Sequence, residues 1–223
     1  MPNLAIVGYG KMGRLADQLA PEYGFTVTAR LDIDRNEPLA GADVAIEFST
    51  PSAVLGNVAK VAALRIPMVV GTTGWLEHLS EAKAIVEKND SALVWSPNFS
   101  VGVNIFTRVV SEAARLFKNE KEYGAWAWEI HHITKKDAPS GTLIKLVEQM
   151  RSAGFDRNID TSSSRAGAHP GTHEIGFDSA ADTITLRHTA RSREGFARGA
   201  LKAAQWIIGR KGFYEFSDVL FGG

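Results

Sequence analysis

Short apolar runs alternate with helix-length segments along the first hundred residues, and this alternation limits the possible folds more than any other feature of the chain. The apolar runs are residues 4–7, 25–31, 43–48, 67–71 and 92–96. Strands that alternate with helices favour a parallel sheet with helices on both faces. The sequence therefore predicts an α/β fold with a Rossmann-type, doubly wound parallel sheet.

The pattern changes after residue 101, which indicates a second and smaller α+β unit. Its expected elements are a helix at about 103–117, an extended run at 124–132, a helix from about 142, and strands near 173–177 and 183–188. The polar segment 158–173, rich in Ser, Gly and Arg, is interpreted as either a mobile loop beside the substrate or a linker. An amphipathic helix at about 196–209 is expected to return to the first domain.

These patterns predict two domains. Residues 1–101, completed by 192–223, form the expected dinucleotide-binding domain, and residues 102–191 form the expected substrate-binding and oligomerisation domain.

Composition narrows the class of partner. The 223 residues include 25 basic and 25 acidic side chains, so the charge pattern of a nucleic-acid-binding protein is missing. The chain has no cysteine, which excludes disulfides and thiolate chemistry. Neither a signal peptide nor an apolar segment of membrane-spanning length is present. We expect a cytoplasmic protein with a small-molecule partner, and neither nucleic acid nor membrane as a partner.

A glycine motif follows the first apolar run and precedes a helical pattern. Its residues are Gly8, Tyr9, Gly10, Lys11, Met12 and Gly13. Such a turn brings backbone N–H groups and a helix N-terminus to a pyrophosphate. Asp32 follows at the end of the second run, where a carboxylate binds the adenosine ribose of NADH. Arg30 and Arg35 keep NADPH open as an alternative, and a glycine-rich turn without a ligand is the structural alternative for the whole motif.

Two further groups follow the fourth and fifth runs, where doubly wound folds bind ligands. They are Gly71, Thr72 and Thr73, and Ser96, Pro97, Asn98 and Phe99. Each group taken alone is also compatible with ordinary loop chemistry. Together they are predicted to flank a nicotinamide.

The segment 129–142, EIHHITKKDAPSGT, combines imidazole, ammonium and a predicted helix start. Ser140, Gly141 and Thr142 precede an amphipathic helix, so N–H groups and hydroxyls point out of its N-terminus. Lys135 or Lys136 adds positive charge. The segment therefore predicts a carboxylate-binding site with an imidazole nearby as proton carrier.

Two alternatives remain for this segment. It is also compatible with a capped helix that follows a strand, with lysines and histidines that have no catalytic role. A metal site is the second alternative, with His131 and His132 joined by His169 or His173. Adjacent histidines of a strand point to opposite faces, so we expect no metal.

The string His-His-x-x-Lys-x-Asp-Ala-Pro-Ser-Gly-Thr, residues 131–142, resembles the signature of the 4-hydroxy-tetrahydrodipicolinate reductase (dihydrodipicolinate reductase) family. Other segments resemble the family in the same order along the chain. They are residues 7–13, 47–51, 69–75, 98–106, 171–177 and 190–207. The resemblance therefore covers essentially the whole chain.

The resemblance implies hydride transfer from NADH or NADPH to a cyclic imine dicarboxylate, giving tetrahydrodipicolinate in the diaminopimelate route of lysine biosynthesis. It implies His131 and Lys135 as catalytic residues and a homotetramer as the assembly. The substrate-binding residues that it implies are His132, Lys135, Ser140, Gly141 and Thr142. Residues 8–13, Asp32, 71–73 and 96–99 are implied to bind the cofactor.

Two other classes of function are compatible with the first domain. A nucleotide sensor or scaffold would not need the imidazole and carboxylate-binding groups of the second domain. A related dehydrogenase acting on another small acid would share the first domain but not the 131–142 string.

Overall fold

The structure is a computed structural model, and it describes residues 1–222. The chain divides into two compact units. Unit 1 combines residues 1–101 with residues from 194 onward, and unit 2 comprises residues 102–193.

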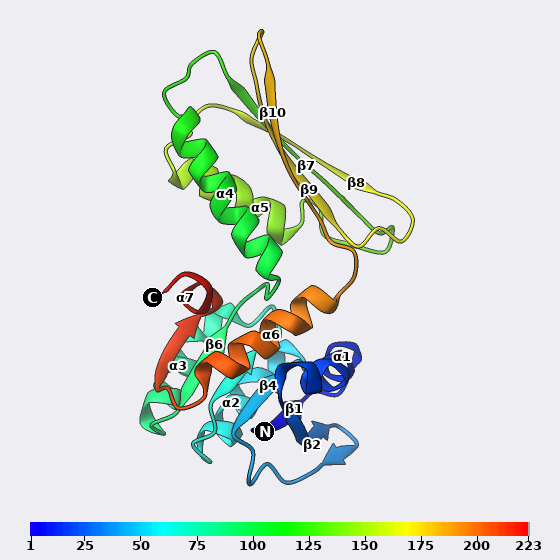
Figure 1. Ribbon diagram of the computed structural model, residues 1–223, viewed down its shortest axis with the longest axis vertical. Helices are drawn as coiled ribbons and strands as arrows, with labels where there is room; N and C mark the ends of the chain where they lie inside the picture. Colours follow the sequence, from blue (N-terminus) through cyan, green and yellow to red (C-terminus); the bar gives the residue numbers. More distant parts are fainter. Residues whose placement is uncertain (223) are drawn as a thin grey trace. The chain divides into compact units, whose positions relative to one another are not determined.

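Unit 1 contains a seven-stranded sheet in the order β11-β6-β5-β4-β1-β2-β3 (Figure 1). The strands are β1 (Asn3–Val7), β2 (Thr26–Asp32), β3 (Arg35–Asn36), β4 (Val44–Glu47), β5 (Met68–Val70), β6 (Ala92–Trp95) and β11 (Gly212–Glu215). All neighbouring strands pair in parallel except β3, which pairs antiparallel with β2. The chain runs from β1 outward to β2 and then crosses to β4, so the strand order reverses beside β1.

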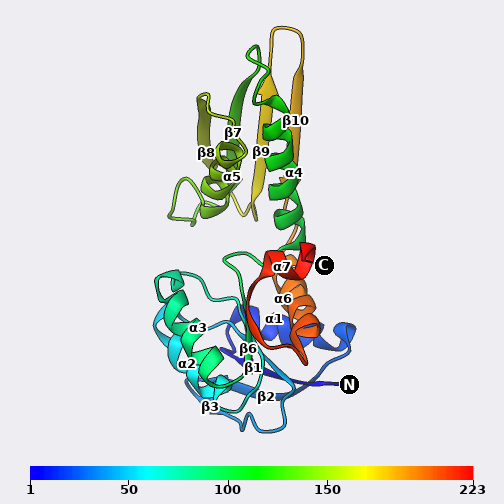
Figure 2. The same ribbon diagram turned by 90° about the vertical axis from the view of Figure 1, so that its left-hand side faces the viewer.

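Helices cover both faces of this sheet, as Figure 2 shows. The helices are α1 (Lys11–Leu19), α2 (Val54–Ala62), α3 (Leu79–Lys88), α6 (Glu194–Ile207) and α7 (Phe216–Phe221), with short 3₁₀ turns at Ala20–Tyr23, Pro51–Ala53 and Leu76–His78. One core lies under α1, α6 and α7 and includes Phe25, and the other lies under α2 and α3. The fold prediction is confirmed: unit 1 is a doubly wound Rossmann-type sheet.

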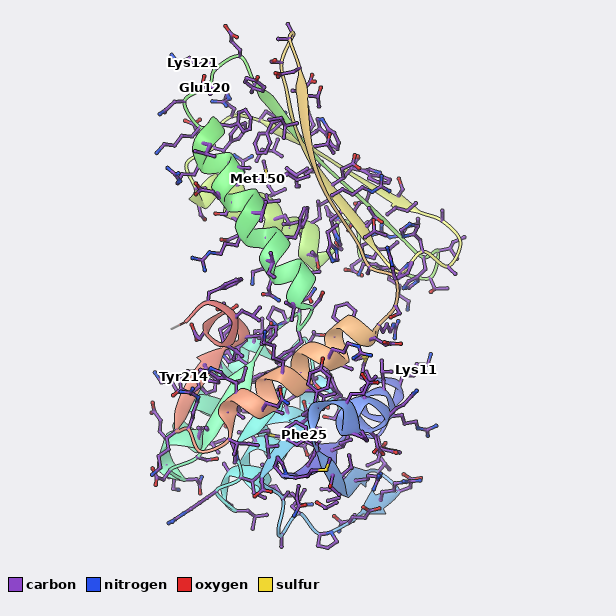
Figure 3. The ribbon with its side chains drawn as sticks, viewed as in Figure 1. Lys11, Phe25, Glu120, Lys121, Met150 and Tyr214 are labelled. Atoms are coloured by element: carbon purple, nitrogen blue, oxygen red, sulfur yellow. The ribbon has the colours of Figure 1, made fainter. Side chains whose placement is uncertain are left out.

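Unit 2 contains a four-stranded sheet in the order β10-β9-β7-β8, with both of its helices on one face (Figure 1). Its elements are α4 (Val101–Phe117), β7 (Gly124–His131), α5 (Gly141–Ser152), β8 (Ile159–Arg165), β9 (Thr172–Asp178) and β10 (Thr183–Thr189). The core under the helices includes Met150 and Phe177, both fully buried. Figure 3 labels Met150 on α5 and Phe25 in unit 1.

Strand β7 explains how the sheet of unit 2 separates core from surface. Ala125 and Ala127 are buried toward the helices, whereas Trp126 and Trp128 alternate with them and remain partly exposed. A Cβ on Gly176 would lie 2.1 Å from the Trp126 ring, so the indole packs against bare backbone of β9. The two tryptophans therefore lie on the face opposite the helices.

The interpretation of 158–173 as a loop or linker is wrong for its first half. Residues Ile159–Arg165 form β8, which pairs in parallel with β7 over its whole length. The strand is at the edge of the sheet, and most of its Ser and Thr side chains are exposed, so it lacks the apolar alternation that identifies buried strands. Ladder hydrogen bonds to β7, rather than apolar burial, fix this segment.

Among the described residues, no helix has both the length and the apolar character needed to cross a membrane.

Candidate active site

The turn between β1 and α1 has a backbone geometry that requires glycine at two of its positions. Gly8 has φ +89°, in the left-handed region, and a Cβ on Gly13 would lie 2.1 Å from the Gly8 carbonyl oxygen. Gly10 is different, because a Cβ there would meet no atom within 4 Å. The N-terminus of α1 is thus open at Gly10, where a phosphate group can approach backbone N–H groups.

Asp32 lies beside this turn. Its Oδ2 accepts a hydrogen bond of 2.9 Å from the backbone N–H of Tyr9, and its Oδ1 accepts one from Ile33 N–H. The side chain ends at the exposed carboxyl end of β2, whereas Asp34 makes no such contact within residues 1–222. An acid placed here, beside an open glycine turn, fits the ribose of an adenine dinucleotide.

Three arginines surround the Tyr9 ring. The guanidinium carbons of Arg14, Arg30 and Arg35 lie 5.8, 5.8 and 4.9 Å from the ring centroid. Arg30 is also paired with Asp17 at 2.7 Å. Arg35 is exposed and lies opposite Asp32 in the β2–β3 pair. The acid and the surrounding cations therefore occupy one end of the sheet.

The groups after β5 and β6 have mixed accessibility. A Cβ on Gly71 would lie 2.1 Å from the Phe48 ring, and the hydroxyl of buried Thr72 accepts a hydrogen bond from Ser49 N–H. Thr73 is exposed beside them. These three residues follow β5 at the carboxyl ends of the parallel strands, where the glycine turn also lies.

The segment after β6 is held by its own hydrogen bonds. The Ser96 hydroxyl donates to the Asn98 carbonyl at 2.8 Å and accepts from Asn98 N–H at 3.1 Å, while Pro97 is exposed. The Phe99 ring is buried in the core, 4.8 Å from the Phe216 ring. Phe99 as a whole is 2% exposed, and a Cβ on Gly199 would lie 1.7 Å from its carbonyl oxygen, so of this group Pro97 and Asn98 are the accessible residues.

In unit 2, polar groups of three strands meet on the helix-covered face. Glu129 on β7 is fully buried, and its Oε1 accepts hydrogen bonds from Ser140 N–H (2.9 Å), the Ser163 hydroxyl (2.9 Å) and Arg165 (3.0 Å). Strand register brings them together, because Glu129 pairs with Ser163 in β8 and with His173 in β9. Because side chains alternate along a strand, His131 shares the face of Glu129.

Two imidazoles lie beside the second oxygen of Glu129. The Nδ1 atom of His131 is 3.3 Å from Oε2, and the Nε2 atom of His173 is 3.5 Å from it. Both histidines are buried, and their ring centroids are 5.1 Å apart in an edge-to-face arrangement. His173 Nε2 also lies 3.1 Å from the Ser140 hydroxyl. Glu129, His131 and His173 thus form one buried cluster.

Burial and hydrogen bonding fix the charge states of this cluster. Burial raises the pKa of Glu129, but its three donors outweigh burial and leave the pKa at about 2. Burial lowers the pKa of His131, the Glu129 carboxylate opposes this, and Lys135 and Arg165 lower the pKa further. Burial also lowers the pKa of His173 to about 4. Near neutral pH the carboxylate is therefore ionised and both imidazoles are neutral.

The predicted helix start lies next to the cluster. Ser140 is the N-cap of α5: its hydroxyl accepts from Leu143 N–H at 3.2 Å, and its own N–H donates to Glu129. Because the hydroxyl and the N–H of Ser140 are buried and form hydrogen bonds within the protein, neither group is available to a ligand. Gly141 is exposed and Thr142 partly exposed, so the open end of α5 is formed by these two residues.

The loop after β7 carries the remaining predicted residues. The Lys135 ammonium lies 2.8 Å from both carboxylate oxygens of Asp137, and that hydrogen bond lowers the pKa of Asp137. Lys136 is exposed. The Nδ1 atom of His132 lies 2.7 Å from the Thr134 hydroxyl, outside the buried cluster. The two adjacent histidines therefore occupy different environments.

The geometry bears on the metal alternative. Ligand atoms of Glu129, His131 and His173 lie within 4.8 Å of one another. Neither His132 nor His169 belongs to this group, and Arg165 already bonds to the carboxylate. The metal alternative is therefore reduced to Glu129, His131 and His173, and the expectation of no metal stays a prediction.

Sequence reasoning missed part of this arrangement. Glu129 could have been found, because it lies two residues before His131 and therefore on the same face of the strand. Ser163 and Arg165 lie in the segment interpreted as a loop or linker, and the sequence indicates His173 only as an alternative metal ligand. Their proximity depends on strand register, which a single sequence does not determine.

Comparison with known proteins gives matches over nearly the whole chain. Two family models match, described as dihydrodipicolinate reductase N-terminus over residues 2–99 and C-terminus over residues 102–220. The chain is 36% identical to the 4-hydroxy-tetrahydrodipicolinate reductase of Christiangramia forsetii, with 98% of this chain and 97% of the relative covered. It is 33% identical to the reductase of Archaeoglobus fulgidus, with 95% and 96% covered.

A solved structure has the same fold. It is dipicolinate-bound dihydrodipicolinate reductase from Paenisporosarcina sp. TG-14, with a TM-score of 0.83 at 23% identity, covering 99% of this chain and 100% of that chain. A probable dehydrogenase from Thermotoga maritima aligns with a TM-score of 0.61 at 10% identity, covering 99% of this chain and 93% of that chain.

A Rossmann-type unit with a glycine turn, followed by a separate unit with a buried imidazole cluster, defines a two-unit oxidoreductase. The family matches specify it further: the chain belongs to the dihydrodipicolinate reductase family. It is a 4-hydroxy-tetrahydrodipicolinate reductase, an enzyme that catalyses one step of lysine biosynthesis.

Proposed function

We propose that the chain reduces the cyclic imine dicarboxylate derived from 4-hydroxy-tetrahydrodipicolinate, with nucleotide bound to unit 1 and substrate to unit 2. The observation that carries the proposal is the neutral, buried imidazole of His131 beside Lys135 and the open start of α5. Reduction takes up one hydride and one proton. When bound, NADH or NADPH would supply the hydride, and His131 delivers the proton that it has taken up from solvent, with Lys135 as its partner.

The nucleotide is proposed to bind at the carboxyl end of the unit 1 sheet. The open Gly10 position and the N-terminus of α1 fit a pyrophosphate, and Asp32 fits a ribose 2′-hydroxyl. The nicotinamide end is assigned to residues 71–73 and 96–99. Exposed Arg35 offers a cation to a 2′-phosphate, so both nucleotides are accepted, with NADH at least as good as NADPH.

The dicarboxylate is proposed to bind to the N–H groups of Gly141 and Thr142, with His132 and Lys135 as further partners. A helix N-terminus carries partial positive charge, and a lysine adds a full charge. The related Paenisporosarcina structure is of a dipicolinate-bound reductase, which supports a dicarboxylate ligand. Ser140 contributes by capping α5, because its hydroxyl is bonded within the protein.

The assembly is proposed to be a homotetramer built on the open face of the unit 2 sheet. Trp126 and Trp128 on this face are partly exposed and are not covered by the helices of unit 2. Light scattering at micromolar concentration tests this proposal. A tetramer supports it, and a monomer contradicts it.

A coupled assay tests the function itself. Dihydrodipicolinate synthase generates the substrate, and absorbance follows the oxidation of NADH or NADPH. Oxidation that requires the synthase product supports the proposal. Absence of oxidation with both nucleotides, under conditions where a known family member is active, contradicts it.

A further inference from the structure

The two oxygens of the Glu129 carboxylate have different environments. Oε1 accepts three hydrogen bonds, from Ser140, Ser163 and Arg165. Oε2 is buried, accepts no hydrogen bond from any of the described residues, and faces the two imidazoles. An ionised oxygen without a donor is costly in a buried site, so a proton must face Oε2.

His131 is the residue placed to supply that proton. Its Nδ1 atom is also buried and has no other hydrogen-bond partner among the described residues, and it lies 3.3 Å from Oε2. A lone pair on Nδ1 would face a negative charge at this distance, whereas an N–H would be attracted to it. His173 is the weaker candidate, because its Nε2 is farther from Oε2, at 3.5 Å, and lies near the Ser140 hydroxyl.

We propose that Glu129 is a positioning residue that holds His131 in the Nδ1–H tautomer, so that the Nε2 lone pair takes up a proton from solvent and the resulting imidazolium, paired with the carboxylate, delivers that proton to the substrate. The inference rests on the proposed role of His131. Glu129 itself touches neither substrate nor cofactor, and it acts through the imidazole. The carboxylate is fixed in turn by its three donors, so the ring is oriented by a rigid group.

Gly171 keeps the other side of the ring free. A Cβ at this position would lie 2.9 Å from Nε2 of His131, and the residue has φ +142°, a conformation that other residues rarely adopt. The side of the ring that exchanges the proton is therefore lined by backbone without a side chain. Nδ1 faces a carboxylate, and Nε2 lies beside the Gly171 backbone, where a side chain would overlap it.

The substitution Glu129→Gln tests the tautomer directly. The three donors at Oε1 require an acceptor, so the amide oxygen takes that position and the amide NH₂ replaces Oε2. An NH₂ group opposite Nδ1 needs a lone pair there, which moves the ring proton to Nε2. Glu148→Gln is the matched control, because Glu148 is exposed on α5 in the same unit.

Nitrogen chemical shifts of ¹⁵N-labelled histidine measure the tautomer, with His131 assigned by the loss of its signals in His131→Ala. We expect Nδ1–H in the parent chain and in Glu148→Gln, and Nε2–H in Glu129→Gln. We expect kcat of Glu129→Gln to fall by about 10²- to 10⁴-fold, with KM and the NADH dissociation constant changed less than about twofold. Comparable thermal midpoints of the two variants would separate this effect from unfolding.

Three results would overturn the inference: Nε2–H in the parent chain, parent-like kcat in Glu129→Gln, or activity that is lost with EDTA and restored by Zn²⁺. The last result would mean that the cluster holds a metal. The tautomer measurement needs no substrate. Failure of the coupled assay would therefore refute the proposed function and leave the Glu129–His131 geometry to be judged by the spectra.

Discussion

Acidification should destabilise unit 2 more than unit 1, because the buried ionisable groups of the two units have opposite pH dependence. In unit 2, burial lowers the pKa of His173 to about 4. The unfolded chain takes up a proton below the ordinary value of 6.5, while the folded unit does not. The contribution of His173 to the stability of unit 2 is therefore fully present above pH 6.5 and is lost as the pH falls toward 4.

The size of this loss follows from the shift. A difference of one pKa unit corresponds to about 1.4 kcal/mol, so His173 alone costs about 3 kcal/mol between pH 7 and pH 4. Glu129, with a pKa of about 2, acts in the next interval: its stabilisation is present above its ordinary value of 4.5 and is lost as the pH falls to about 2. For a unit of this size, 3 kcal/mol lowers the urea midpoint by about 2 M.

Unit 1 contains a buried group whose contribution to stability changes with pH in the opposite direction. Burial raises the pKa of Glu47, which is fully buried, although hydrogen bonds from Ser49, Thr72 and Asn57 oppose the shift. Above its folded pKa, the folded unit carries the cost of a buried charge. Protonation relieves that cost, so Glu47 stabilises unit 1 as the pH falls.

Fluorine NMR of 5-fluorotryptophan separates the units, because Trp126 and Trp128 lie in unit 2 and the other three tryptophans lie in unit 1. We expect the unit 2 midpoint to fall by about 2 M urea from pH 7 to pH 4, and the unit 1 midpoint to fall less or to rise. His173→Asn should reduce the pH dependence of the unit 2 midpoint without abolishing it, because burial also lowers the pKa of His131 and of His188, whereas exposed His78→Asn should leave it unchanged. Parallel decline of both units, or a constant unit 2 midpoint, would refute the reasoning.

Five substitutions at three places test the proposed nucleotide and substrate sites. Gly13→Ala should destabilise unit 1 by about 1–3 kcal/mol and weaken NADH binding, because its Cβ would overlap a loop carbonyl, whereas Gly10→Ala should weaken binding without changing the thermal midpoint. Calorimetry and titration with NADH measure both quantities. Asp32→Ala should weaken the binding of NADH more than the binding of NADPH, because a carboxylate accepts hydrogen bonds from a ribose 2′-hydroxyl and repels a 2′-phosphate. Lys135→Ala should lower kcat and raise KM, and the matched Lys136→Ala should change little in steady-state assays.

Each of these outcomes has a contrary result. Equal loss of stability in the two glycine variants would contradict the overlap argument. If Asp32→Ala lost equal affinity for NADH and NADPH, Asp34 instead of Asp32 would be the residue that binds the ribose. A larger effect of Lys136→Ala than of Lys135→Ala would reverse the assignment of the charged group.

The sequence predicts the buried strands of unit 1 well, because strands covered on both faces are apolar runs bounded by turn residues. It misses β3, β8 and β11, which lie at sheet edges. The three missed strands have little apolar periodicity, and pairing with a neighbour determines their conformation.

The candidate site divides in the same way. Local signals predicted the glycine turn and the α5 start, because each depends on residues that are adjacent in sequence. The Glu129 network joins residues up to 44 positions apart, from Glu129 on β7 to His173 on β9. Such contacts follow from strand register, so the anchoring of His131 becomes evident only in the folded chain.

The central claim is that His131 handles the proton while unit 1 binds nucleotide independently. The most direct test compares kcat and the NADH dissociation constant of His131→Ala with those of the parent chain, with exposed His78→Ala as control. The account predicts that kcat falls by about 10²- to 10⁴-fold in His131→Ala while NADH binding stays within about twofold. Parent-like turnover in His131→Ala would contradict it.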